Sequence, residues 1–149
     1  MEEPYGRLSN PSEKLIFALS LITRESDYQL EQANSAQESA RQLNVGVEIS
    51  YADSDAIKQS QQLLQVIQNR SSEVNALIFE PAGSTALPHV ARAAAAAGLG
   101  WVVMNRIDDS IAELRSQYES PACTVTEDHR ETGRILGRQG RLSSSWALR

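Results

Sequence analysis

The sequence has 149 residues, of which 41% are hydrophobic and 22% are charged, a size and composition that suit one compact domain with a buried core. Fourteen basic residues stand against nineteen acidic ones, which leaves a net charge of −5, and no cluster of lysines and arginines accumulates that could neutralise a run of phosphates. This charge pattern argues against direct binding of nucleic acid, which needs a basic surface to neutralise a run of phosphates.

The first 13 residues mix Pro4, Gly6 and Pro11 with charged residues, which predicts a flexible leader ahead of the fold. They show no basic segment followed by a long apolar one, so we expect no secretory signal peptide. The apolar run at 15–22 is too short to span a membrane. Cys123 is the single cysteine and is most simply a packed small residue, so it leaves the compartment open.

Five apolar segments have the composition of strands buried in a parallel sheet. They span 14–22, 45–51, 74–79, 99–105 and 123–126. Apolar or small residues at helical spacing predict four helices. The first spans 27–43, the second runs from a cap at Ser54 or Asp55 to Ile67, the third spans 86–97 and ends at Gly98, and the fourth spans 129–137. The segment at 108–121 is polar, and its pattern predicts neither a helix nor a strand.

Strands that alternate with helices in this way predict an α/β fold, a three-layer doubly wound parallel sheet of about five strands. Ligands bind such sheets outside the carboxyl ends of the strands. We therefore expect function in the loops that follow Ile22, Tyr51, Phe79, Asn105 and Thr126.

The order and spacing of 14–43, 53–62, 76–84, 97–106 and 125–137 resemble the amino-terminal lobe of ribose-binding-protein-like receptors. These belong to the periplasmic-binding-protein and lac-repressor-type sugar-binding family. Each matched piece is common alone, but five in register are hard to obtain by chance. The resemblance implies one sugar-binding-protein-like lobe at 14–139, which in the family closes on a monosaccharide together with a second lobe.

The resemblance also implies ligand-binding residues at the start of the first helix. Ser26, Tyr28 and Gln29 fall where the family has an Asn-Pro-Phe-Phe-like stretch, whose aromatic rings stack on a sugar. Tyr28 can still stack on a ring, whereas Gln29 cannot. The departure at Gln29 weighs against simple ribose specificity.

Asn105 and Arg106 take the place of the family's Asp-Arg pair after the fourth strand. The Arg106 guanidinium donates several hydrogen bonds to hydroxyl or carboxylate oxygens, and this residue is the first candidate for ligand binding. A neutral Asn105 in place of an aspartate favours a sugar acid or a phosphorylated sugar. Asp128 matches the aspartate of the Ser-Asp-Asn that precedes a Gly-Arg helix in the family.

No motif supports an enzyme. The sequence has no GxGxxG after a strand, no Walker-type loop and no nucleophile elbow, and His89 and His129 lack further ligands at metal-binding spacing. We expect no catalytic residue, no cofactor and no metal.

The segment at 140–149 does not match the family and is expected to be an atypical tail, with the second lobe absent. A lobe without its partner leaves a sheet edge or an apolar groove uncovered, and such surfaces promote self-association. We therefore expect a truncated receptor that forms a homodimer.

The leading functional hypothesis is the sugar-binding component of an ABC-type transporter, or a remnant of one. Its partners are then a sugar or sugar derivative and a transporter permease or a signalling partner. Its location is periplasmic by resemblance, and the cytoplasm stays open because no signal peptide is seen. The alternative is the ligand-sensing domain of a lac-repressor-type regulator, although 13 leader residues are too few for DNA-binding helices. A receiver-like signalling domain is less favoured because Glu80, and not an aspartate, follows the third strand.

Overall fold

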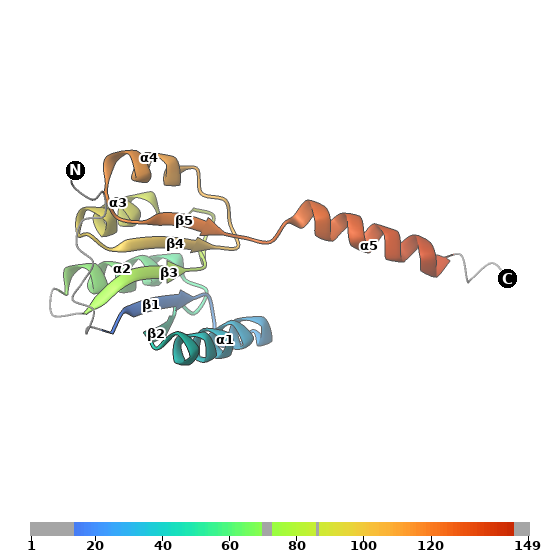
Figure 1. The fold of residues 1–149 in the computed structure, drawn as a ribbon, viewed down its shortest axis with the longest axis horizontal. Helices are drawn as coiled ribbons and strands as arrows, with labels where there is room; N and C mark the ends of the chain where they lie inside the picture. Colours follow the sequence, from blue (N-terminus) through green and yellow to red (C-terminus); the bar gives the residue numbers. More distant parts are fainter. Residues whose placement is uncertain (1–13, 70–72, 86, 145–149) are drawn as a thin grey trace, which may run out of the picture.

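The computed structural model describes residues 14–69, 73–85 and 87–144. The expected leader at 1–13 and residues 145–149 of the expected tail lie outside the described residues. Strands and helices alternate along the chain (Figure 1), in the order β1 (Ile16–Leu21), α1 (Asp27–Leu43), β2 (Gly46–Tyr51), α2 (Ala56–Gln68), β3 (Val74–Phe79), α3 (Pro88–Ala96), β4 (Gly100–Met104), α4 (Ser110–Gln117), β5 (Ala122–Val125) and α5 (His129–Ser144).

The strands form one parallel sheet in the order β2-β1-β3-β4-β5, which confirms the predicted α/β doubly wound fold. The connection from β1 to β2 runs one way across the sheet, and all later connections run the other way. Because such crossovers are right-handed, α1 lies alone on one face while α2, α3 and α4 share the opposite face. The reversal of direction places the loop after β1 beside the loop after β3.

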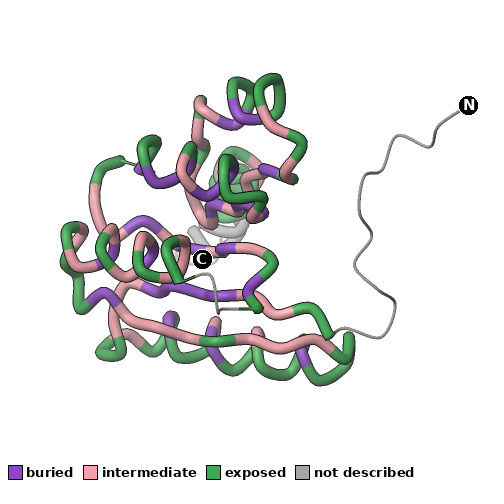
Figure 2. Tube along the Cα trace, turned by 90° about the vertical axis from the view of Figure 1, so that its left-hand side faces the viewer, coloured by how far each residue is buried: buried purple, intermediate pink, exposed green. Residues whose placement is uncertain are grey.

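The two faces carry cores of unequal size. On the face of α2, α3 and α4, Trp101 and Phe79 are fully buried with ring centroids 4.6 Å apart, and helix residues such as Val90 close over them. On the face of α1, the fully or nearly buried residues are Leu19, Leu21 and Ala33. Buried segments alternate with exposed ones along the helices, as expected when one side of each helix packs on the sheet (Figure 2).

Helix ends follow the sequence signals where a cap residue is present. The Asp55 carboxylate accepts hydrogen bonds from the backbone N–H groups of Ile57 and Lys58, which confirms it as the cap of α2. Gly98 has a φ of +81°, the left-handed conformation expected for the residue that ends α3. These two residues explain why the predicted boundaries of α2 and α3 were close.

The structure differs from the prediction in two places. The polar segment at 108–121, for which no element was predicted, contains α4, which buries Ile111 and Leu114 against the sheet. Two apolar residues three positions apart are a helical signal too short to recognise in a polar segment. The last helix, predicted to end at Gly137, continues to Ser144.

Helix α5 extends away from the lobe beyond the end of β5 (Figure 1). Nothing lies within 4 Å of where a side chain would begin at Gly133 or Gly137, and Ile135 and Leu136 are 45% and 61% exposed. Among the described residues, no helix has both the length and the apolar composition to cross a membrane.

A buried glutamine ties α2 to the loop at the end of β3. The Gln59 amide donates to the Ser20 hydroxyl at 3.1 Å and to the Glu80 carbonyl at 2.9 Å, and its oxygen accepts from the Ala82 N–H at 2.9 Å. Its side chain is 1% exposed, so each of these partners loses its bond without access to water if the amide is removed.

We expect Gln59→Ala to lower the free energy of unfolding by roughly 2–4 kcal/mol, because it opens a cavity and leaves buried polar groups unpaired. Gln61→Ala, the same change at an exposed position of α2, should alter it by less than about 0.5 kcal/mol. Urea denaturation of both variants measures the difference. Equal losses in the two variants would contradict the role assigned to this network.

Candidate functional site

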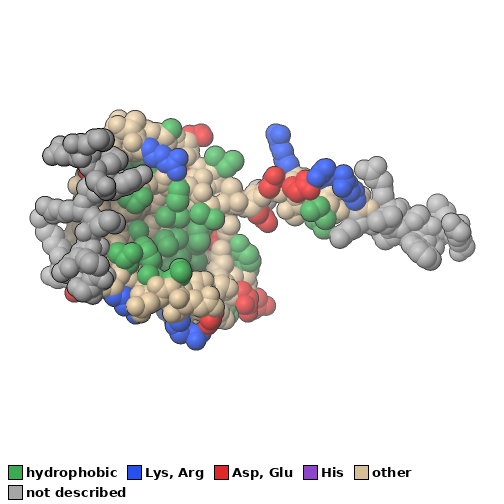
Figure 3. Space-filling view, in the orientation of Figure 1, with side chains coloured by type: hydrophobic (Ala, Val, Ile, Leu, Met, Phe, Trp, Pro, Cys, Tyr) green, Lys and Arg blue, Asp and Glu red, His purple; other side chains and the backbone are tan. Residues whose placement is uncertain are grey.

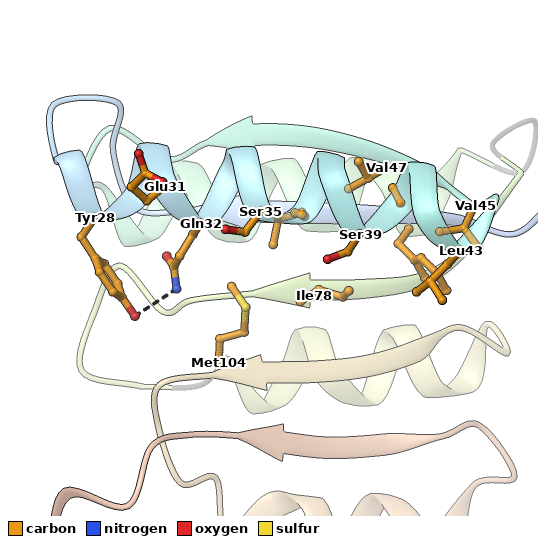
Figure 4. A pocket seen from close by; sticks show the side chains of 14 residues that line it. Tyr28, Glu31, Gln32, Ser35, Ser39, Leu43, Val45, Val47, Ile78 and Met104 are labelled. Atoms are coloured by element: carbon orange, nitrogen blue, oxygen red, sulfur yellow. Dashed lines mark hydrogen bonds between the residues drawn. The ribbon is translucent and has the colours of Figure 1, made fainter. Parts of the chain in front are cut away.

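The loops after β1 and β4 meet at the carboxyl edge of the sheet. The Asn105 side-chain N–H donates to the Tyr28 hydroxyl oxygen at 2.9 Å, which joins the residue after β4 to the first turn of α1. The Gln32 amide donates to the same oxygen at 3.2 Å (Figure 4). Tyr28 is 56% exposed, so its ring is held from its hydroxyl end and stays accessible.

Arg106 links the loop after β4 to the loop after β3. Its guanidinium donates to the backbone carbonyl of Ser84 at 2.6 Å, and the residue is half-buried. A guanidinium has five N–H donors in a planar fork, so this bond orients the group and uses only part of its capacity. The remaining donors suit hydroxyl, carboxylate or phosphate oxygens.

Asn105 itself has a left-handed backbone with a φ of +57°. Asparagine tolerates this conformation better than most residues. The backbone N–H of Asn105 donates to the Val125 carbonyl at 2.8 Å, so the turn is anchored to the end of β5. This anchoring presents Asn105 and Arg106 at the carboxyl edge.

Sequence reasoning missed the role of Gln29. This residue is 3% exposed, and its amide donates to the Glu80 carboxylate at 2.5 Å and to the Gln32 side chain at 2.8 Å, while its oxygen accepts from the Ile22 N–H at 2.6 Å. It therefore connects the loops after β1 and β3 beneath Tyr28. A polar residue on the sheet-facing side of the first helical turn was the available signal.

Two other predicted site residues have structural positions. Ser26 is the half-buried residue that precedes α1, and its side chain makes no capping hydrogen bond there. The Asp128 carboxylate accepts from the N–H groups of Arg130 and Glu131 at 3.1 Å each and so caps α5. Within the described part of the chain, the carboxylate of Asp128 thus bonds to the backbone of its own helix and not to Asn105 or Arg106.

The loop after β2 is occupied by internal contacts. Asp53 forms an ion pair with Lys58, and the hydrogen bond and positive charge of Lys58 lower the pKa of the Asp53 carboxyl. The Arg24 guanidinium lies 4.7 Å from the centre of the Tyr51 ring, within cation–π range. Asp53 and Asp55 therefore serve the structure at this end of the sheet.

The carboxyl edge thus brings together an accessible aromatic ring, an oriented guanidinium and a side-chain amide from loops that are distant in the sequence. The set offers hydrogen-bond donors beside an apolar ring face, which is the chemistry needed to bind a small polyhydroxylated or anionic molecule. Tyr28, Asn105 and Arg106 are the predicted residues that the fold assembles there.

Solved structures with a similar fold are chains about twice as long as this one. The arabinose-transporter binding protein of Shewanella sp. ANA-3, bound to L-arabinofuranose, is 19% identical with a TM-score of 0.70, over 87% of this chain and 40% of that one. A Mycobacterium smegmatis protein in complex with β-D-fucofuranose is 19% identical with a TM-score of 0.69, over 90% of this chain and 41% of that one. The myo-inositol binding protein of Caulobacter is 18% identical with a TM-score of 0.65, over 87% and 40%. At these identities the likeness shows the fold.

A search of curated proteins finds no match. The family model described as a periplasmic binding protein domain matches residues 17–140, which includes all five strands of the sheet. Because this match covers most of the chain, the protein belongs to the periplasmic binding protein domain family.

Proposed function

We propose that this chain binds a carbohydrate or a close derivative of one at the carboxyl edge of its sheet, as the solute-binding part of an ABC-type sugar transporter. The observation that carries the proposal is the hydrogen bond from Asn105 to Tyr28, with Arg106 next in the chain. This hydrogen bond holds the aromatic face of Tyr28 next to the hydrogen-bond donors of the loop after β4. Ser26 and Asp128 stay predictions as further ligand contacts.

The chemistry of this edge supports a polyhydroxylated ligand. An aromatic ring covers the apolar C–H face of a sugar, and the Arg106 fork donates to hydroxyl oxygens or to an acidic substituent. Asn105 contributes a neutral amide where a carboxylate would repel an anion, which extends the proposed ligands to sugar acids and sugar phosphates. Three of the similar structures have D-allose, L-arabinofuranose or myo-inositol bound, and each of these ligands carries several hydroxyl groups.

The partners and the compartment belong to the same proposal. A family of binding proteins supports a role in binding without catalysis. A transporter permease or a signalling partner, and a periplasmic location, follow from the family resemblance. The chain spans about two fifths of each similar structure.

We expect at least one monosaccharide, sugar acid or sugar phosphate at millimolar concentration to raise the melting temperature of the chain. Arg106→Ala should abolish that shift, because it removes the donors that the Ser84 carbonyl orients. Arg92→Ala is the matched control, since Arg92 lies on α3 and pairs with Glu113 away from the carboxyl edge. A thermal-shift screen of the three proteins measures this, and a shift that survives in Arg106→Ala would contradict the assignment of the site.

Two substitutions at Tyr28 distinguish the contribution of its aromatic ring to binding from that of its hydroxyl group. Tyr28→Phe keeps the ring and loses the bonds from Asn105 and Gln32, so affinity should fall by a small factor. Tyr28→Ala also removes the ring face and should lower affinity by about tenfold or more, since burial of such a side chain contributes roughly 1.5 kcal/mol. Titration calorimetry with the ligand found in the screen gives both values. Equal losses in the two variants would show that the ring does not stack on the ligand.

A further inference from the structure

An apolar groove of about 530 Å³ runs along α1 on the face that this helix covers alone. Figure 3 shows hydrophobic side chains gathered on this face over the middle of the sheet, beside α1. Figure 4 shows Ile78 and Met104 below α1, with Tyr28 at one end of the groove and Leu43 at the other. The main apolar lining residues are Leu19, Val47, Ile78, Met104, Ala36 and Ala40.

The groove exists because one helix cannot cover the faces of all five strands. Helix α1 packs on the β1 and β2 side of the sheet, where Leu19, Leu21 and Ala33 are buried. Ile78 of β3 and Met104 of β4 lie farther along the sheet and are only half-buried. An apolar surface of this kind on a soluble domain commonly marks an interaction site.

Among the described elements, helix α5 is the one whose apolar side chains lack a surface to pack against. Its sequence contains three glycines, each of which disfavours an isolated helix by roughly 1 kcal/mol relative to alanine. Isolated helices of about this length are marginal in water, and most helical stability comes from the packing of an apolar side. Leu136 lies on the side of α5 opposite the row formed by Arg130, Arg134 and Arg138, and Ile135 lies at the edge of that side.

The dimensions and charges of α5 match the groove. The groove follows α1 from Tyr28 to Leu43, about 22 Å at 1.5 Å per residue, and the 16 residues of α5 span about 24 Å. Helix α5 carries four arginines and one glutamate, a net charge of +3, whereas residues 14–128 carry eight basic and fifteen acidic residues, a net charge of −7. Glu31 lies at the groove itself. Opposite net charges favour the association of α5 with an acidic lobe.

We propose that α5 of one copy of this chain lies in the α1 groove of a second copy, and that the exchange is reciprocal. The proposal is independent of ligand binding at the carboxyl edge. A second copy is favoured over the chain's own lobe because α5 already extends away from its sheet, and only residues 126–128 separate it from β5. Short hinges of this kind promote exchange between identical chains, and the reciprocal arrangement buries two helices and two grooves per dimer.

Single-cysteine chains distinguish exchange from self-closure. In a Cys123→Ala background, one chain carries Leu136→Cys and a second chain, enlarged by a tag, carries Met104→Cys. Each chain has one thiol, so a disulfide between them is necessarily intermolecular. We expect the mixed pair to cross-link under mild oxidation in high yield. A tagged chain with Ile57→Cys is the control, because Ile57 is 71% exposed on α2, on the opposite face of the sheet. It should cross-link at least tenfold less.

A chain that carries both Leu136→Cys and Met104→Cys supplies the opposing test. If it forms only an internal disulfide and the mixed pair does not cross-link, α5 folds onto its own groove and the proposal is overturned. If neither disulfide forms, the groove accommodates something other than α5, and the proposal is overturned as well.

Light scattering gives a second, independent measurement without new thiols. We expect the chain to be dimeric at micromolar concentration, and Leu136→Ser to weaken the dimer at least tenfold, while Ile57→Ser leaves it unchanged. Because Leu136 does not pack on its own lobe, the melting temperature of Leu136→Ser measured at high dilution should equal that of the unchanged chain. A monomer at all concentrations, or a dimer that survives Leu136→Ser, would contradict the proposed contact.

Discussion

The order β2-β1-β3-β4-β5 is the constraint on which the other features of this molecule depend. The chain reverses its direction across the sheet once, after β2. Because the crossovers are right-handed, this reversal places α1 on one face and α2, α3 and α4 on the other. The same reversal sends the adjacent loops after β1 and β3 to opposite faces of the sheet, and a ligand site belongs at this point of a doubly wound sheet. The proposed site at the edge and the apolar groove on the α1 face therefore have a common origin.

Two buried glutamines hold the loops at the carboxyl edge in place. Gln29 connects Ile22 to Glu80 from below Tyr28, and Gln59 connects Ser20, Glu80 and Ala82 from α2. Each side chain is almost fully buried and uses both its oxygen and its N–H groups, so the loops cannot shift without breaking hydrogen bonds that water does not replace. Tyr28 and Arg106 are thus presented on a supported edge, which lowers the entropic cost of ordering them around a ligand.

Tyr28 borders both proposed surfaces. Its hydroxyl accepts from Asn105 at the carboxyl edge, and its ring lies at one end of the α1 groove. The two surfaces are therefore adjacent at this residue.

By itself, the sequence determined the elements and the class of fold. The signals for these elements lie close together in the sequence, as for the apolar strand segments, the Asp55 cap and Gly98 at the end of α3. Helix α4 was missed because two apolar residues, Ile111 and Leu114, are too few to form a helical pattern. Family resemblance pointed to Tyr28, Asn105 and Arg106. Only the tertiary structure decided that Gln29 joins two loops and that the α1 face retains a groove. Those features depend on residues that are distant in the sequence and are brought together by strand order and helix packing.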